Sequence, residues 1–237
     1  MASTELIPTK HESPIVPEPE SNDSLHMRHA TPTDLELLVD YYEQAAIGST
    51  GTGFDAKERE ETRVAFGYML DDENYGAEVL EDEDGPVAAI LFEYNSPAIK
   101  VDGFEALGES PQEIDAQTAI DLACDLDPDI KRVHVTSLAV DEDKRGMGLG
   151  IQLMEKFEQE QAGKTDVITF QTGKDNKAMI RLAEKCGFTL IDVKDDTMKG
   201  YDGEYLVAVK VIGELADRLH QQKEDNLREL LKDVEGL

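Results

Sequence analysis

The sequence has no tryptophan, two cysteines and few basic residues, and these shortages exclude several classes of protein. The two cysteines, Cys124 and Cys186, cannot build a disulfide framework, which fits a reducing compartment. No Cys-x-x-Cys or His-Glu-x-x-His grouping is present, so no metal site is expected. No apolar run reaches the roughly 18 residues of a membrane-spanning helix, and no secretory signal is expected. These features predict a cytoplasmic protein.

Positive charge is also scarce, with 23 Lys and Arg against 52 Asp and Glu and a formal net charge of −29. A surface of this sign repels nucleic acid and anionic membranes, so neither is expected as a partner. It attracts cationic partners such as polyamines, aminoglycosides or basic proteins. A general adaptation to solubility or salt explains the same composition, so the charge alone selects no partner.

The 237 residues are enough for one sizeable core with appendages. Residues 1–24 hold four prolines and no apolar periodicity, which predicts a disordered tail. Residues 25–211 are expected to form one domain, in which residues 95–130 are an insertion-like segment with a helix near Pro111–Leu126. Residues 212–237 read as an amphipathic helix that either packs on the domain or contacts a partner, such as a second copy.

Within the domain, strands alternate with helices, which predicts an α/β fold with helices around a mixed sheet. The expected strands are Leu25–Ala30, Ala77–Leu80, Pro86–Tyr94, Arg132–Val140, Asp166–Gln171, Phe188–Val193 and Glu204–Val211. The expected helices are one that starts at Thr31-Pro32, with Thr31 as its N-cap, and then Asp55–Leu70, Met147–Ala162 and Asp175–Cys186. Ile47–Phe54, rich in glycine and threonine, is expected to be a loop.

A glycine-rich turn, Arg145-Gly146-Met147-Gly148-Leu149-Gly150, lies between a predicted strand and a predicted helix. Glycines let a backbone approach a ligand closely, and the free amides at a helix start form an anion site. Two nucleotide motifs fail here, because Gly150 is followed by Ile151-Gln152 rather than Lys-Ser or Lys-Thr, and the spacing is GxGxG rather than GxGxxG. The glycines alone are also compatible with a purely structural turn.

The turn resembles the R/Q-x-x-G-x-G/A motif of the GNAT N-acetyltransferase superfamily. Leu138-Ala139-Val140-Asp141 before it is similar to that family's fourth strand. Asn176-Lys177-Ala178-Met179-Ile180-Arg181-Leu182-Ala183-Glu184-Lys185-Cys186-Gly187-Phe188, about 30 residues later, resembles its second conserved block, N-x-x-A-x-x-L-Y-E-K-x-G-F. The resemblance is clear over about 131–205 and implies a GNAT-like, mostly antiparallel mixed sheet flanked by helices.

The resemblance also implies that acetyl-CoA is the acyl donor. Its pyrophosphate is expected at the turn, on Arg145, Gly146, Gly148, Gly150 and Ile151, and its pantetheine arm on the main chain of Leu138 and Val140. Asn176 often contacts the cofactor in relatives, and it is equally well placed to cap a helix.

Many relatives carry a glutamate base six residues before the position of Val140, where this chain has His134. A histidine titrates near neutrality, which suits a base, although a strand histidine can also lack a catalytic role. The relatives' tyrosine that protonates the thiolate is replaced here by Ala183, which leaves Tyr94, Tyr201 and Tyr205 as substitutes.

The expected reaction is acetyl transfer to a primary amine of a small molecule or protein, by direct attack on the thioester. A base or a water relay must take the amine's proton, because a protonated amine cannot attack. Tyr41, Tyr42, Glu43 and the 47–54 loop are candidates for acceptor contacts, as in relatives, or for simple packing. The replacement by Ala183 motivates an alternative, a non-catalytic acetyl-CoA-binding sensor or scaffold.

Overall fold

The computed structural model describes residues 25–50, 52–95, 104–106, 118, 122, 129–194 and 204–235. The tail expected at 1–24 and the helix expected at Pro111–Leu126 lie outside these residues, apart from Thr118 and Leu122, which are helical.

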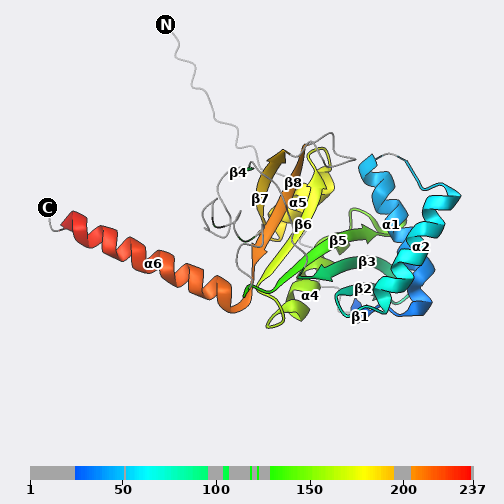
Figure 1. The fold of residues 1–237 in the computed structure, drawn as a ribbon, viewed down its shortest axis with the longest axis horizontal. Coiled ribbons are helices and arrows are strands. Elements are labelled where there is room, and N and C mark those ends of the chain that lie inside the picture. The colour runs from blue at the N-terminus through cyan, green and yellow to red at the C-terminus, as the bar shows by residue number, and fades with distance from the viewer. Residues whose placement is uncertain are drawn as a thin grey trace, which may run out of the picture.

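One eight-stranded sheet organises the molecule, in the order β1-β2-β3-β5-β6-β8-β7-β4 (Figure 1). The pair β5–β6 is parallel and the other pairs are antiparallel, so the sheet is mixed and mostly antiparallel, as the family resemblance implied. The strands are β1 (His26–His29), β2 (Tyr75–Asp82), β3 (Gly85–Tyr94), β4 (Phe104–Ala106), β5 (Arg132–Val140), β6 (Val167–Gly173), β7 (Thr189–Lys194) and β8 (Glu204–Val211).

Helices cover both faces of this sheet. On one face, α1 (Leu35–Thr50) and α2 (Ala56–Leu70) bury Leu38 and Phe66 against Val79 and Leu91. As predicted, Thr31 caps the helical entry: a short 3-10 turn, Pro32–Asp34, leads into α1, and the Asp34 carboxylate accepts from the Thr31 amide at 2.8 Å. The prediction of a loop over Ile47–Phe54 is partly wrong, because α1 continues to Thr50.

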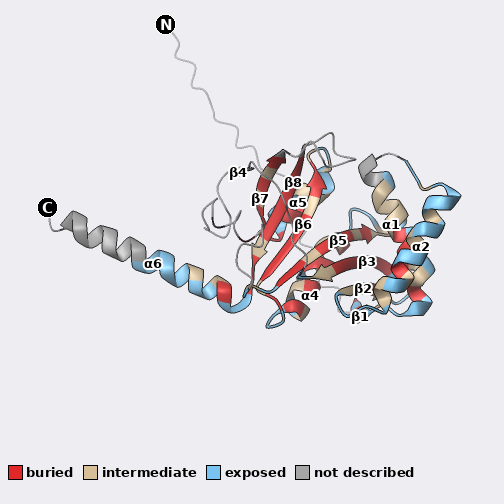
Figure 2. Ribbon diagram, in the orientation of Figure 1, coloured by how far each residue is buried: buried red, intermediate tan, exposed pale blue. Residues whose placement is uncertain are grey.

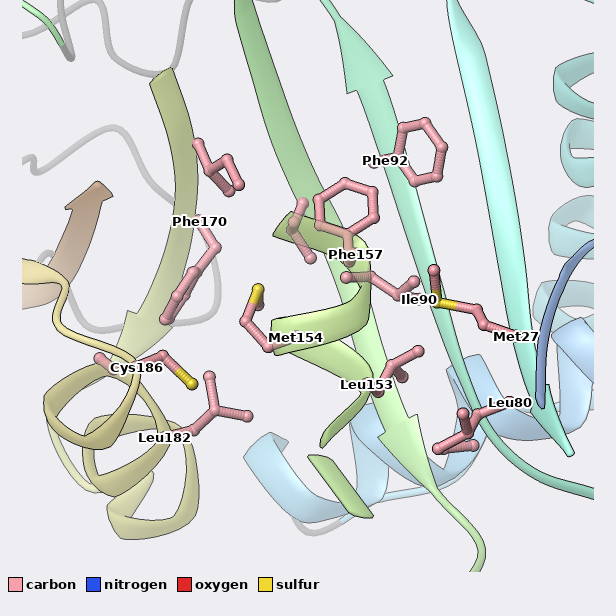
Figure 3. Close-up of a cluster of buried hydrophobic side chains, with 14 of the residues drawn as sticks. Met27, Leu80, Ile90, Phe92, Leu153, Met154, Phe157, Phe170, Leu182 and Cys186 are labelled. Carbon is pink, nitrogen blue, oxygen red and sulfur yellow. The ribbon is translucent and has the colours of Figure 1, made fainter. Parts of the chain in front are cut away.

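On the other face, α4 (Leu149–Gln161) and α5 (Lys177–Lys185) enclose the largest core cluster. Leu153, Met154 and Phe157 of α4 lie between β3 and β6 in Figure 3. All three are fully buried, and Phe157 packs against Phe92 with ring centroids 4.9 Å apart. Figure 2 shows the same buried sheet beneath exposed helix surfaces. This core fixes α4, and with it the glycine turn at the start of α4.

The final helix, α6 (Gly213–Glu235), projects from the body of the molecule in Figure 1. Its first turns rest on the sheet, where Leu215 is buried with Val209 and Val211, and Leu219 packs on the same cluster. Residues 221–225 are exposed. No helix among the described residues is long and apolar enough to cross a membrane.

Candidate active site

The centre of the sheet contains a gap, because β5 and β6 pair over only part of their lengths. Their pairing runs from Arg132 opposite Val167 to Val135 opposite Phe170, and β5 continues beyond it to Val140. The two strands diverge visibly in Figure 1. A bulge contributes to the divergence, since Thr136 has no partner between the pairs Leu91–Ser137 and Phe92–Val135 on the β3 side.

The edge of β5 that borders this gap presents main-chain groups that pair with no described strand. The amide of Asp141 donates to the carbonyl oxygen of Val87 on β3 at 2.9 Å. Successive residues of a strand turn their main-chain groups to opposite edges, so Val140 and Leu138 present theirs to the gap. The carbonyl oxygen of Val140 accepts from Nε of Arg145 at 3.2 Å, which leaves its amide available. An extended ligand can therefore hydrogen-bond along β5 as an extra strand would.

At the end of β5 the chain makes the glycine turn. A single 3-10 turn, Glu142–Lys144, is followed by Gly146 and Gly148 at φ +83° and +81°, a conformation that strains residues with a Cβ. A Cβ built on either glycine meets no atom of the described residues within 4 Å. Both glycines thus serve the backbone conformation and leave open space above it.

Most amides of this turn have no partner in the described part of the chain. None of the five successive amides from Gly146 to Gly150 has a hydrogen-bond partner among the described residues. The flanking amides are engaged, because Arg145 donates to Glu142 at 3.3 Å and Ile151 to Gly148 at 3.0 Å. The free amides sit at the N-terminus of α4, where the helix dipole adds positive potential. This donor set fits a diphosphate.

Gly150 has a different task from its two neighbours in the motif. A Cβ there would lie 3.3 Å from Cδ1 of Leu182 on α5, and 3.6 Å from side-chain carbons of Leu138 and Val140 on β5. The glycine therefore allows α4 to approach both elements closely. This approach places the start of α4 at the mouth of the gap.

The cations of the turn are already paired. Nζ of Lys144 lies 2.8 Å from Oδ2 of Asp82, and Nη2 of Arg145 donates to Oε1 of Gln44 on α1 at 3.2 Å. Arg145 thus holds the turn against β5 and α1, and to meet a phosphate as predicted its exposed guanidinium must share or exchange these partners. Anion binding here depends first on amides.

His134 lies at the closed end of the gap, on the face opposite α4. Its neighbours Val133 and Val135 join the core under α4, so the His134 side chain points to the other face. There Nδ1 lies 2.9 Å from Oγ1 of Thr169 on β6, the residue directly opposite in the ladder. Burial lowers the pKa of His134 from 6.5 to about 4, which corrects the expectation of titration near neutrality.

Ala183, which replaces the relatives' tyrosine, is fully buried in the core between α5 and the sheet. Its methyl group cannot protonate a thiolate. Tyr94 shares the α4 face with Phe92 and donates to Oε1 of Gln161 at 3.2 Å, on the face away from His134. Tyr205 is buried on the face that His134 shares, opposite Gly173 of β6. Tyr201 lies outside the described residues. Among the three tyrosines, only Tyr205 is thus described on the correct face.

Asn176 caps α5, since its side-chain oxygen accepts from the amide of Met179 at 3.2 Å. The capping role is therefore present, and the side-chain amide nitrogen remains for a ligand contact.

The candidates for acceptor contacts on α1 mostly serve packing. Tyr41 is 2% exposed, and burial raises the pKa of its hydroxyl to about 12. Tyr42 packs against Phe54 and Phe66. Glu43 accepts from the Phe54 amide at 3.1 Å and pairs with Arg59 at 2.7 Å, so its carboxylate fastens the connection between α1 and α2.

Thr169 is the site residue that the sequence interpretation missed. It is the one polar residue in the apolar run Val167-Ile168-Thr169-Phe170, and a buried hydroxyl in a central strand requires a partner. That requirement was the available signal, although the sequence could not show that the partner is His134.

Comparisons with known proteins agree with this geometry. A sequence model of the acetyltransferase (GNAT) family matches residues 37–188, whereas no curated protein matches the chain.

Among solved structures, the chain is similar to a spermidine N-acetyltransferase from Vibrio cholerae in complex with CoA and spermine, with 12% identity over 80% of this chain and 96% of that one and a TM-score of 0.55. It is also similar to a putative acetyltransferase from Acinetobacter baylyi, with 16% identity over 79% and 93% of the chains and a TM-score of 0.54.

A third similar structure is NAA60 from Arabidopsis thaliana in complex with a bisubstrate analogue, with 14% identity over 79% and 98% of the chains and a TM-score of 0.52. At these identities the structural likeness concerns the fold, and the family match spans most of the chain. The parted central strands, the free amides of the turn and the family match together place this chain in the GNAT family of acetyltransferases.

Proposed function

We propose that this chain transfers the acetyl group of acetyl-CoA to a primary amine of a small molecule or protein. The single observation that carries the proposal is the run of five amides, Gly146 to Gly150, that have no hydrogen-bond partner within the described residues and lie at the mouth of the gap between β5 and β6. When the diphosphate of acetyl-CoA is bound there, the pantetheine arm attached to it is directed along the edge of β5 that borders the gap. Acetyl-CoA supplies the acetyl group as a reactive thioester.

The chain's own residues then have separate tasks. The turn, with Gly146, Gly148 and the amide of Gly150, holds the diphosphate, and Leu138 and Val140 orient the arm through their main chains. Asn176 contacts the same ligand through its side-chain amide nitrogen. His134, at the closed end of the gap, is the proposed catalytic side chain. A neutral imidazole either accepts or donates a hydrogen bond at the nitrogen that faces the reaction, and the position of its single proton decides which.

We further propose that the acceptor is a cationic amine. The formal charge of −29 attracts cations, and the similar Vibrio cholerae structure is of an enzyme named for spermidine, solved with spermine. Polyamines and basic protein termini both meet this description.

A second candidate function is that of a non-catalytic acetyl-CoA sensor or scaffold. The observation that favours it is Ala183, which places a buried methyl group where many relatives have a tyrosine hydroxyl. A sensor would bind acetyl-CoA at the same turn and release no thiol in the presence of any amine.

Two measurements test the proposal in order. Calorimetric titration with acetyl-CoA first establishes whether the ligand binds, and absence of binding would contradict both candidate functions. Thiol release is then followed with a panel of spermidine, spermine, an aminoglycoside, basic peptides and a neutral monoamine. Release with a cationic acceptor supports the transferase, whereas binding without release across the panel favours the sensor.

We also propose that the protein is cytoplasmic. Burial raises the pKa of the Cys186 thiol to about 11, so this cysteine is suited to packing rather than to redox chemistry.

We propose in addition that two copies of the chain form a dimer through α6. Beyond the packed Leu215 and Leu219, residues 221–225 are exposed, and this part of the helix is the surface that we propose a second copy contacts. Sedimentation of the full chain, compared with a chain that ends at Gln222, measures whether this helix supports a dimer.

A further inference from the structure

The His134–Thr169 pair occupies the place where a ligand threaded into the gap must stop. The last pair of the β5–β6 ladder is Val135 opposite Phe170, and His134 opposite Thr169 is the pair directly behind it. The reactive end of a ligand whose diphosphate sits at the turn is the end that reaches this point. The side chains of this pair therefore decide which polar atoms the acetyl group meets.

The hydrogen bond between the two side chains can be formed in two ways. Either the Thr169 hydroxyl donates to Nδ1, which puts the ring proton on Nε2, or Nδ1–H donates to the hydroxyl and Nε2 is a free acceptor. In the second arrangement the hydroxyl hydrogen of Thr169 needs another acceptor. Thr169 is 1% exposed and has no other hydrogen bond among the described residues.

Burying that hydrogen without a partner is unfavourable, because a buried donor loses its water and gains nothing in exchange. The first arrangement leaves no such orphan, because the hydroxyl donates to Nδ1 and the imidazole, which is less buried than Thr169, can give its Nε2–H to water. The geometry thus selects the tautomer with the proton on Nε2.

We propose that Thr169 positions His134 as a neutral hydrogen-bond donor, whose Nε2–H stabilises the negative charge that develops on the acetyl oxygen. This inference rests on the proposed function, and it assigns His134 a role different from the base that the resemblance implied. The neutral amine forms a bond to the acetyl carbon as the carbon–sulfur bond of the thioester breaks, and the amine's proton leaves through water, which can pass it to the departing thiolate. Thr169 is a positioning residue, since it acts through the imidazole.

The surroundings of His134 agree with a donor and disfavour a base. A base becomes an imidazolium during the reaction and needs a stabilising anion nearby. Glu93 of β3 lies opposite His134 in the ladder, but its carboxylate is hydrogen-bonded to Tyr75, and desolvation is the cause of the depressed pKa of His134. A neutral donor needs no such partner, and a donor that is already positioned acts without reorganisation.

The tautomer can be measured directly on the protein without ligand. In the full chain labelled with ¹⁵N-histidine, long-range ¹H–¹⁵N correlations distinguish the protonated ring nitrogen from the unprotonated one, and the signals of His134 are those missing in H134Q. We expect a protonated Nε2 at neutral pH, and a protonated Nδ1 would overturn the proposal. In T169V the tautomer should shift toward Nδ1–H, whereas T169S should keep Nε2–H.

Turnover separates the donor from the base through two matched variants. H134Q retains a side-chain N–H donor and cannot accept a proton, whereas H134E restores the family's usual base and donates nothing at neutral pH. We expect H134A to lower kcat roughly 100-fold with the KM for acetyl-CoA unchanged, H134Q to retain more activity than H134E, and T169V to lower kcat roughly tenfold with rescue by T169S.

The opposite order, with H134E the more active variant, would overturn the donor role. Unchanged turnover in both H134Q and H134E would overturn any catalytic role of His134, whatever the tautomer. Failure of the proposed function is distinguishable from both results, because a chain without transferase activity shows no thiol release from the unaltered protein. Circular dichroism and thermal melting of each variant confirm that the lost activity is not lost folding.

Discussion

Gly148 and Gly163 offer a matched pair for testing the turn. Both have a positive φ, +81° and +78°, and a Cβ on either meets nothing within 4 Å. Gly148 lies in the turn, whereas Gly163 follows the C-terminal end of α4. We expect Gly148→Val to weaken acetyl-CoA binding at least tenfold, because a β-branched residue costs about 1–2 kcal/mol in this conformation and distorts the amide cradle. Titration calorimetry measures the effect.

Gly163→Val controls for backbone strain alone. It should lower the free energy of unfolding about as much as Gly148→Val does and leave acetyl-CoA affinity unchanged. Equal loss of affinity in the two variants would mean that general destabilisation, and not the turn, governs binding.

The depressed pKa of His134 predicts a dependence of stability on pH. The unfolded chain binds a proton at this residue near pH 6.5 and the folded chain only near pH 4, so the unfolded state takes up the proton first as the pH falls. The folded state should therefore lose up to about 3 kcal/mol between pH 6.5 and 4 through this group, and none above pH 7.

Urea unfolding of the unaltered chain and of His134→Gln, at pH 7, 5 and 4, isolates this contribution, because other titrating groups cancel in the difference. The unaltered chain should lose more stability on acidification than the variant. An equal loss in both would show that His134 titrates normally.

At this scale the sequence predicted the positions better than the chemistry. The glycines of the turn could be recognised from the sequence, because a backbone with positive φ that is approached closely by a ligand favours glycine. The altered pKa of His134 could not, since it follows from burial by segments distant in sequence. Thr169 was missed for the same reason: its partner lies 35 residues away on the neighbouring strand.

Among the elements, α5 lends itself to a test of its N-cap. Asn176→Ala removes the acceptor for the Met179 amide and should lower the free energy of unfolding by about 1 kcal/mol. Asn176→Asp keeps an acceptor and should retain that stability. Both variants lack the side-chain amide nitrogen, so both should bind acetyl-CoA more weakly if this nitrogen contacts the ligand.

Chemical denaturation and titration calorimetry on the same samples read the two roles separately. If Asn176→Asp binds acetyl-CoA with unchanged affinity, Asn176 serves only as the N-cap of α5 and does not contact the ligand.

Most strands and helices of the domain followed from local patterns, as with the capped start at Thr31-Pro32. The boundary of α1 did not, because the glycine and threonine residues that suggested a loop from Ile47 begin within the last turns of that helix. No local sequence pattern indicated that β5 and β6 diverge. Each strand has ordinary strand composition, and only the register with β3 places a bulge at Thr136.

For the whole molecule, the charge of −29 predicts opposite salt effects on the two substrates. Acetyl-CoA is anionic, so raising the salt from about 0.01 to 0.15 M, which shortens the Debye length from about 30 to 8 Å, should strengthen its binding a few-fold. A polycationic acceptor should bind more weakly over the same range. Calorimetry for the donor and KM for the acceptor measure the two trends.

A neutral monoamine serves as the control acceptor and should respond less than spermine. Should salt leave the KM of spermine unchanged, the surface charge concerns solubility and not the choice of acceptor.

The divided sheet also has a mechanical consequence. Four residue pairs between β5 and β6 are the ladder that joins β1, β2, β3 and β5 to the remaining strands. The pantetheine arm of a cofactor bound between the parted strands forms hydrogen bonds that the two strands do not form with each other. It therefore helps to hold the two halves of the sheet together. Deuterium uptake at the main-chain amides of Leu138 and Val140 should then be fast in the protein without ligand and slow in the complex with acetyl-CoA. The exchange rates of these two amides would therefore report how much of the protein has bound the cofactor.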